Sequence, residues 1–383
     1  MENGMKSYVC EKFGIEFPLF AFSHCRDVVA EVSRAGGLGV FGALSLSPEQ
    51  LEQELTWIDQ HVNGKPYGVD VVVPNTIAGK GEQLDSEKIL KLIPDEHKTF
   101  VNKILKSNDI DTSDLNADRQ EHLRYAMNLQ ESGAQELLDV AFSHPIKLIA
   151  NALGVAPKIM LDMARKDDVA AAALVGTKEH AINQAKAGVD IIVAAGGEAG
   201  GHCGSVSTLV LIPEVIEAIK NVADIPVLAA GGIVTGRQMA ACMAMGASGA
   251  WTGSVWLTTH EAETNQIVKE KMLQASSRNT VRSRSRTGKP SRQLSSPWTD
   301  AWESTDSPES LPMPLQSFVS EPALRKIDKL ADGGHEGAKK LATYWVGQGV
   351  GLMNQSMSVR SVVQDFQEDF INAYENLDSF ITD

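Results

Sequence analysis

Short apolar segments alternate with amphipathic segments along the chain as far as residue 273. The apolar segments are mostly unbroken runs, a pattern typical of parallel strands that helices cover on both faces. They predict eight strands, at 15–20, 38–41, 67–73, 146–150, 171–175, 190–194, 226–230 and 249–252. The amphipathic segments predict helices at 26–35, 48–61, 155–165, 178–187, 210–220, 235–245 and 261–274. Eight successive strand–helix units predict an α/β protein with a closed TIM-type (β/α)₈ barrel.

Two regions interrupt this alternation. Residues 79–145 are polar, charged and helical in pattern, which predicts a helical insertion after the third strand. Residues 275–383 follow the helix predicted to be the last of the barrel, and they begin with an arginine-bearing stretch and a proline-containing loop. We therefore predict a barrel in residues 1–274 and a C-terminal loop and helical appendage in 275–383 that packs on the barrel.

Composition narrows the class of protein. The chain has 383 residues, 43% of them hydrophobic, and a net charge of −14. This length fits one barrel with additional elements, and the acidic balance disfavours nucleic acid as a partner. The four cysteines form no CxxC pair, which is typical of reduced thiols in a cytoplasm.

Targeting and membrane segments are not expected. The N-terminal 14 residues lack the apolar core of a signal peptide. Residues 238–259 carry no charge, but glycine, serine and threonine interrupt them, so we interpret them as a helix followed by a buried strand. We therefore expect a soluble cytoplasmic protein without a membrane partner; the sequence leaves a homo-oligomer open.

Two glycine turns are candidates for a phosphate site. Gly231 and Gly232 follow the seventh predicted strand, and Gly253 and Ser254 follow the eighth. Glycine lets the backbone approach a ligand closely, and the free N–H groups at a helix start suit a phosphate. The loops after strands seven and eight are the usual phosphate site of such barrels, whereas either turn alone is also compatible with an ordinary strand–helix connection.

A third glycine-rich loop, 196–204, follows the sixth strand and has five glycines in nine residues. It suits wrapping around a flat ligand, with His202 at its tip as the candidate acid or base. Glu198 is either a second acid/base or an anchor of the loop, and the anchor is favoured. Cys203 is disfavoured as a nucleophile paired with its neighbour, because adjacent side chains diverge.

Other polar residues allow less specific interpretations. His24 and Cys25 follow the first strand and either line the pocket mouth or serve packing and helix entry. The arginine run at 278–292 is most simply a solvated loop. We find no histidine, cysteine and carboxylate set with metal-ligand spacing, so no metal site is predicted.

In these loops the sequence resembles the nitronate monooxygenase family, once called 2-nitropropane dioxygenases. The resemblance covers most of the chain, and the 79–145 insertion is its least typical part. The segments that carry it are 35–39, 198–204, 229–233, 246–254, 287–292 and 347–351.

The resemblance implies FMN on a TIM barrel and oxidation of an alkyl nitronate with O₂ to a carbonyl compound and nitrite. It implies His202 as the catalytic residue, either deprotonating a neutral nitroalkane or steadying the nitronate charge. Backbone of residues 21–23 would pass the flavin ring, and the two glycine turns would hold the phosphate. The implied cofactor-binding set is Ala21, Phe22, Ser23, Asp70, Glu198, Gly200, Gly201, Gly231, Gly232, Trp251, Thr252, Gly253 and Ser254.

Two positions depart from the family pattern. The family often has asparagine at Asp70 and glutamine at Ala195, and both positions commonly touch flavin. An ionised Asp70 would disfavour negative charge on a reduced flavin. FMN is expected to remain bound, because the backbone and phosphate contacts are kept.

Three alternatives remain beside the monooxygenase. The same loops occur in NAD(P)H-dependent flavin reductases of the quinone or enoyl-thioester type. A barrel retained as a non-enzymatic binding protein would lack flavin. A phosphosugar barrel without flavin would need only the phosphate loops, but the loop around His202 and segment 21–23 suit a flat ring.

Overall fold

The protein is described here from a computed structural model, which covers residues 5–72, 91–113, 115 and 131–381. Eight parallel strands close into a barrel, each hydrogen-bonded to the next in chain order, and β9 returns to β1. The strands are β1 (Leu19–Ser23), β2 (Leu38–Gly42), β3 (Tyr67–Val71), β4 (Leu148–Asn151), β5 (Ala170–Val175), β6 (Ile191–Ala195), β8 (Val227–Ala230) and β9 (Gly249–Thr252). The predicted (β/α)₈ barrel is confirmed.

Most strand predictions agree with the structure within a few residues, but the first is displaced. The strand predicted at 15–20 begins only at Leu19. The N–H groups of Glu16 and Phe17 both donate to the carbonyl of Gly36 instead of joining the barrel ladder, and Pro18 has no N–H to donate. Residues 15–18 therefore form an irregular segment that leads into β1.

Alternate strand positions fill the barrel interior with small and apolar side chains, among them Phe20, Val40, Ala150 and Val193. Helix α1 (Tyr8–Phe13) closes the amino-terminal end, where the Phe13 and Phe20 rings meet edge-on at 5.5 Å between centroids. The opposite, carboxyl-terminal end of the strands therefore forms the mouth on which the strand–helix loops converge.

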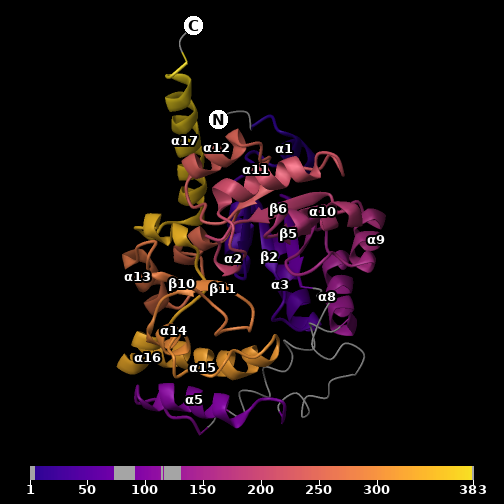
Figure 1. Cartoon of the computed structure of the whole chain (residues 1–383). Helices are drawn as coiled ribbons and strands as arrows, with labels where there is room; N and C mark the ends of the chain where they lie inside the picture. The colour runs from indigo at the N-terminus through magenta and orange to yellow at the C-terminus, as the bar shows by residue number, and fades with distance from the viewer. Residues whose placement is uncertain (1–4, 73–90, 114, 116–130, 382–383) are drawn as a thin grey trace.

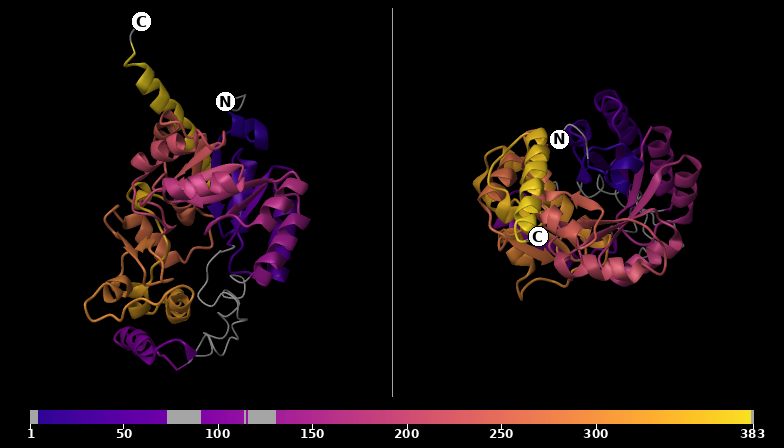
Figure 2. Two further views of the ribbon diagram at one scale, coloured as in Figure 1. Left: turned by 45° about the vertical axis from the view of Figure 1, so that its right-hand side comes forward. Right: turned by 90° about the horizontal axis from the view of Figure 1, so that it is seen from above.

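An outer ring of helices covers the barrel (Figures 1 and 2). Seven of them lie in the chain between one barrel strand and the next: α2 (Arg26–Arg34), α3 (Pro48–His61), α8 (Glu131–Ser143), α9 (Lys158–Lys166), α10 (Lys178–Ala187), α11 (Thr208–Ile219) and α12 (Gly236–Ala244). Helix α8 packs on α3 and β3, so part of the predicted 79–145 insertion is the third helix of the barrel.

The eighth helical position is filled from the end of the chain. Helix α17 (Val359–Asp378) packs against α12 and α2 and thus closes the ring. The prediction that 261–274 forms the last barrel helix is wrong: α13 (Gln266–Gln274) packs against η1 (Ser254–Thr258), η2 (Gln348–Leu352) and α15 (Leu315–Asp332). A helical pattern directly after the last strand cannot reveal that the chain first leaves the ring and returns about a hundred residues later.

The part of the chain between η1 and α17 forms a layer at the mouth end of the barrel, seen below the barrel in Figure 1 and called the added layer from here on. It contains β10 (Thr280–Ser283), β11 (Ser291–Leu294), α14 (Pro297–Trp302), α15 (Leu315–Asp332) and α16 (Glu336–Leu341). β10, β11 and β7 (Gly201–His202) form an antiparallel three-stranded sheet. Helix α5 (Asp95–Lys106) packs on α15. Within the described residues, no helix is both long and apolar enough to cross a bilayer.

Candidate active site at the barrel mouth

The turn after β8 has the geometry that the tandem glycines predict. Gly231 and Gly232 have φ values of 105° and 70°, a left-handed region that favours glycine. The side chain of Gln238 holds the turn, because its Oε1 accepts the Val234 N–H at 2.9 Å and its Nε2 donates to the Gly232 carbonyl at 2.9 Å. Among the described residues we find no acceptor for the N–H groups of Gly232 and Ile233, so both are available to an anion.

The second turn, after β9, lies beside the first because the two strands are paired. A side chain at Gly253 would meet nothing within 4 Å, so the turn borders open space. The Oγ of Ser254 accepts the N–H of Gly347 at 2.8 Å. A Cβ on Gly349 would lie 2.6 Å from the Gly232 carbonyl oxygen, which shows how closely segment 347–349 crosses both turns. Sequence reasoning assigned this segment no part in the site.

Glu198 anchors the third loop. Its Oε2 accepts hydrogen bonds from the N–H of Thr208, at 2.9 Å, and from the hydroxyl of Thr208, at 3.0 Å. Thr208 is the first residue of α11, so the carboxylate also faces the positive end of that helix. The backbone carbonyl of Glu198 accepts the Gln348 N–H at 2.9 Å. Of the two roles considered for Glu198, the anchor is the one that these contacts describe.

The two glycines before the histidine differ in what their small size permits. A Cβ at Gly200 would lie 2.8 Å from the Gly347 nitrogen, so Gly200 lets another segment of the protein pass. A Cβ at Gly201 would meet nothing within 4 Å, and its φ is 73°. Gly201 therefore borders open space at the mouth, whereas Gly200 is a packing position.

His202 lies on β7, opposite Ser291 of β11. Its Nε2 is 2.8 Å from the hydroxyl of the buried Thr287. That hydroxyl donates to the Lys289 carbonyl at 3.3 Å and so accepts from Nε2–H, which leaves Nδ1 as the basic nitrogen. The imidazole has exposed surface, yet protein surrounds it, as expected inside a concavity. Burial, with a smaller effect of the Lys289 charge, lowers the pKa of His202 to about 4.

The arginine run is not simply a solvated loop, and that prediction is wrong for three of its members. Arg292 donates to the Gly197 carbonyl through Nε, at 3.0 Å, and Nη2, at 2.8 Å. Arg282 donates to the Cys203 carbonyl at 3.2 Å. The two guanidinium groups thus fasten the loop that carries His202. Both are members of a charge run whose partners are about ninety residues away, so spacing alone gives no sign of their role.

Arg286 is the third of these arginines and is 4% exposed. Its Nε and Nη2 donate to the two carboxylate oxygens of Glu321 on α15, at 2.6 and 3.2 Å. The guanidinium carbon lies 3.9 Å from the ring centroid of Trp345. This bidentate, stacked pair joins the loop between β10 and β11 to the core of the added layer.

Asp70 lies inside the barrel near its mouth, in register with Gly42 and Ala150 on the neighbouring strands. The side chain is 5% exposed, and its Oδ1 has no hydrogen-bond partner within the described part of the chain. Burial among apolar neighbours raises the pKa of Asp70 well above its usual value. Burial therefore favours the neutral carboxyl group and opposes the negative charge considered from the sequence.

The remaining predicted positions contribute mainly backbone. Ala21 is fully buried, and the Oγ of Ser23 accepts the Cys25 N–H at 3.0 Å. The hydroxyl of Thr252 donates to the Phe20 carbonyl and accepts from Trp256, so its proton is not available to a ligand. Two further aromatic residues lie here: Phe22 is partly buried at the end of β1, and Trp251 stacks on Phe20 inside the barrel at 6.3 Å.

The cysteines near the mouth are poor nucleophiles. Burial raises the pKa of both Cys25 and Cys203, so both are thiols at neutral pH. Cys25, Asp27 and Glu263 bring ligand atoms within 4.8 Å of one another, but the Cys25 thiol donates to the Glu261 carbonyl at 3.2 Å. A protonated thiol is not a metal ligand, so this group carries no assignment.

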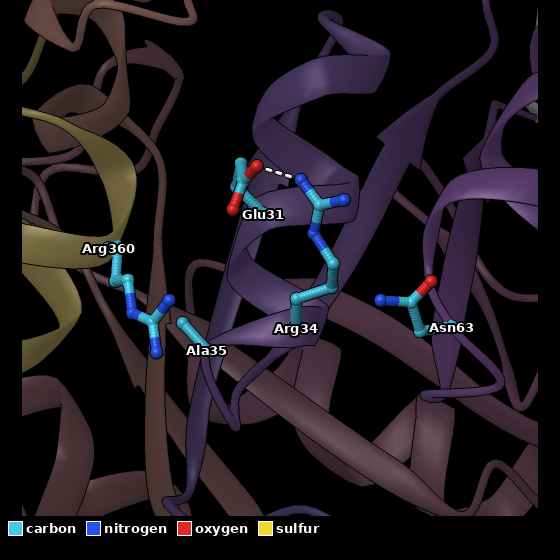
Figure 3. Close-up of a pocket in the computed structure, with 5 residues that line it drawn as sticks. All are labelled: Glu31, Arg34, Ala35, Asn63 and Arg360. Atoms are coloured by element: carbon cyan, nitrogen blue, oxygen red, sulfur yellow. Dashed lines mark hydrogen bonds and ion pairs between the residues drawn. The ribbon is translucent and has the colours of Figure 1, made fainter.

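A separate hollow of about 380 Å³ lies on the outer wall, where α2 faces α17 (Figure 3). Glu31 and Arg34 form an ion pair on α2, while Arg360 approaches from α17. None of the residues that line the hollow belongs to the strand-end loops, so it is distinct from the mouth.

Comparison with known proteins identifies relatives of the whole chain. The family described as nitronate monooxygenase matches residues 6–369. A protein of Mycobacterium tuberculosis named as a monooxygenase is 52% identical, over 98% of this chain and 100% of the relative. A protein of Staphylococcus saprophyticus named as a nitronate monooxygenase is 27% identical, over 92% of this chain and 94% of the relative.

Solved structures share the fold at lower identity. A nitroalkane oxidase from Streptomyces ansochromogenes has a TM-score of 0.77 at 22% identity and covers 96% of this chain and 99% of its own. FabK from Thermotoga maritima has a TM-score of 0.70 at 23% identity, covering 98% of this chain and 100% of its own. Both agree with the barrel and with the added layer over its mouth.

Proposed function

The chain belongs to the nitronate monooxygenase family, and from this premise we propose that it oxidises alkyl nitronates with O₂ and FMN, with His202 as the catalytic residue. Family membership makes it an oxidoreductase and implies a flavin. The finer assignment rests chiefly on one observation: an uncharged histidine with a fixed hydrogen bond stands on the loop whose Glu198 lies close to the glycine turn after β8, where two backbone N–H groups have no acceptor among the described residues. A carbonyl compound and nitrite would be the products.

The residues at the mouth fit an FMN molecule. Gly201 and Gly253 border open space, as a cradle for a ligand requires. The free N–H groups after Gly231 suit the phosphate, together with Gly253 and Ser254. The orphaned Oδ1 of Asp70 offers a neutral carboxyl group at the mouth, where it can share a hydrogen bond with a flat polar ring. Backbone of residues 21–23 would line the ring.

His202 would act on the substrate as a proton acceptor. A neutral imidazole can take the α-proton of a nitroalkane on Nδ1, which leaves the nitronate anion, while the Thr287 hydroxyl holds Nε2 in place. A histidine with so low a pKa brings no positive charge to steady a preformed nitronate, so of the two roles considered, the proton acceptor is favoured. When bound, the flavin supplies the electron-accepting chemistry that couples the nitronate to O₂.

The pH dependence follows from the same pKa. The basic form of His202 is present above about pH 4 and is lost as the pH falls through that value. We therefore expect kcat/KM for a neutral nitroalkane to show no acidic limb from His202 near its ordinary pKa, at about 6.5. A limb near 6.5 that disappears in His202→Asn would contradict the lowered pKa.

The test is an anaerobic spectrum of the purified protein, mixed separately with propyl-2-nitronate and with NADH or NADPH. Bleaching of the flavin bands by nitronate alone, followed by nitrite release in air, is the expected result. Bleaching by the pyridine nucleotide alone would instead support a reductase, the activity named for the enoyl reductase domain of MlnA, whose structure has a TM-score of 0.69 at 17% identity. A protein without flavin bands that gains none from added FMN would contradict both.

A further inference from the structure

A second histidine lies at the same mouth and has no part in the proposed mechanism. His24 directly follows β1, three strands from β6 around the barrel. Its Nδ1 is 3.0 Å from the carbonyl oxygen of Gly42, at the end of β2. The ring of Phe22 packs edge-on against it, with 5.1 Å between centroids. The imidazole is thus held in one orientation on two sides.

Gly42 makes this position possible. A Cβ on Gly42 would lie 2.6 Å from Nδ1 of His24 and 2.9 Å from the Phe22 ring. Any other residue there would push the imidazole away from the strand end. The absence of a side chain at Gly42 therefore allows both aromatic rings to close over β2.

The hydrogen bond to Gly42 fixes which nitrogen carries the proton. A carbonyl oxygen only accepts, so Nδ1 of His24 must be the donor. In the neutral ring Nε2 then bears the lone pair. Burial lowers the pKa of His24, with a smaller lowering effect of the Arg286 charge, so the neutral ring is the form at physiological pH. Within the described part of the chain, Nε2 has no hydrogen-bond partner, although the side chain has exposed surface.

One loop connects His24 with His202. Arg286 is near enough to influence His24 electrostatically, and the next residue, Thr287, holds Nε2 of His202. His202 thus contacts the loop between β10 and β11, the charge of the same loop acts on His24 through space, and both imidazoles combine exposed surface with surrounding protein. Two such rings are expected to face one concavity.

We infer that His24 is a second ligand-binding residue of this mouth, whose Nε2 accepts a hydrogen bond from an N–H or O–H group of the bound molecule. This inference rests on the proposed function, because the donor is a ring N–H of the bound flavin. An alkyl nitronate has no N–H or O–H group, so the nitronate itself cannot supply the donor.

Two substitutions distinguish a role of His24 in ligand binding from a role in the fold. In His24→Asn the amide nitrogen takes the place of Nδ1 and keeps the bond to Gly42, but nothing replaces Nε2. In His24→Gln the longer side chain brings an amide oxygen to the place of Nε2, but the bond to Gly42 is lost. His180→Asn, at an exposed histidine on α10, is the matched control.

Each variant is measured in three ways: melting temperature, affinity of the apoprotein for FMN by fluorescence titration, and KM for propyl-2-nitronate at saturating FMN. We expect His24→Asn to melt like the parent and to weaken FMN binding by about 3- to 10-fold, the effect of one hydrogen bond. The KM for propyl-2-nitronate should stay unchanged, because this anion has no donor group for Nε2. His24→Gln should regain part of the loss.

The opposite pattern would overturn the inference. If His24→Asn matches the parent in FMN affinity, or if only His24→Gln loses melting temperature and binding, His24 serves the fold through Gly42 alone. The FMN titration needs no turnover, so it remains informative even if nitronate is not the substrate.

A spectroscopic measurement on the unmodified sequence avoids the question of folding. Protein labelled with ¹⁵N-histidine should show a neutral Nδ1–H tautomer for the resonance that is missing in His24→Asn. Its Nε2 signal should move when FMN is added to the apoprotein. An Nε2–H tautomer, or an Nε2 signal that FMN does not move, contradicts the proposal.

Discussion

The two sides of the barrel mouth are built in different ways. On the phosphate side, the turns at Gly231–Gly232 and Gly253–Ser254 follow adjacent strands, so their geometry comes from the barrel itself. On the histidine side, His202 stands on a two-residue strand that pairs, within the described part of the chain, with β11 alone, some ninety residues later. Without the added layer the phosphate turns would still be formed by their strands, whereas the loop of His202 would lose its sheet, its arginine bonds and its threonine.

From this difference we assign cofactor binding to the phosphate side and catalysis to the histidine side. The phosphate side needs only backbone N–H groups at fixed positions, and a closed barrel supplies these rigidly. The histidine side needs an imidazole that is uncharged and held in one orientation. This requires a hydrogen-bond partner for the imidazole and protein packed around it. Because the added layer supplies both, damage to the layer should affect turnover more than cofactor binding.

The variant His202→Asn should have the largest effect, and it should affect only the histidine side. It removes the proton acceptor but leaves the phosphate turns intact, so flavin content should remain normal. Turnover of neutral nitroalkanes should fall by about 10²–10⁴-fold, the usual contribution of a general base. Steady-state nitrite release measures the rate, with His180→Asn as control. An unchanged rate would remove His202 from catalysis.

A second variant is aimed at the added layer and leaves both glycine turns unchanged. Arg286→Met removes the guanidinium from the largely enclosed carboxylate of Glu321, which should cost about 3–5 kcal/mol of unfolding free energy. Denaturant unfolding measures this cost, and Arg278→Met, at an exposed arginine of the same segment, is the control.

The double variant Arg286→Met with Glu321→Leu sharpens the result. If the loss comes from the uncompensated charge, removing the second partner should restore most of the stability. If the double variant is no better than the single one, the stacking of Arg286 on Trp345, and not its charge, carries the effect.

The comparison also explains which features the sequence could predict. Strands, most helices and the glycine turns are local: apolar runs fall within a few residues of the observed strands, and tandem glycine marks the left-handed turn at Gly231–Gly232. The partners of His202 could not be predicted, because Thr287 is separated from it by 85 residues. The arginines looked solvated for the same reason.

The placement of α17 shows a further limit of sequence patterns. Its apolar stripe predicts a helix at the end of the chain but does not say what the stripe packs against. Only the pairing of α17 with α12 and α2 reveals it as the eighth barrel helix. The neutrality of Asp70 likewise depends on its apolar surroundings inside the barrel, which the residue type does not reveal.

On the phosphate side, the corresponding variant is Gly232→Val. A β-branched residue at a φ of 70° is strained by about 1–3 kcal/mol, and its Cβ would lie 3.0 Å from that of Glu198. We expect FMN affinity to fall about tenfold or more, which equilibrium dialysis can measure. Gly334→Val is the control, because its φ of 88° brings similar strain in a place where a Cβ meets nothing within 4 Å. Equal FMN affinity in the two variants would contradict the phosphate assignment.

The smallest expected effect concerns the hydrogen bond between Thr287 of the added layer and His202. Thr287→Val keeps the shape of the side chain but leaves Nε2–H of His202 without an acceptor. One hydrogen bond of this kind contributes about 0.5–1.5 kcal/mol, so kcat/KM should fall by about 2- to 10-fold, with normal FMN affinity. Thr56→Val, on the exposed face of α3, is the control.

The mechanism of the loss can also be checked: without the threonine either ring nitrogen can hold the proton, so ¹⁵N-histidine spectra should show a mixture of tautomers where the parent shows one. A fall in FMN affinity as large as the fall in kcat/KM would mean that the two sides of the mouth are not separable.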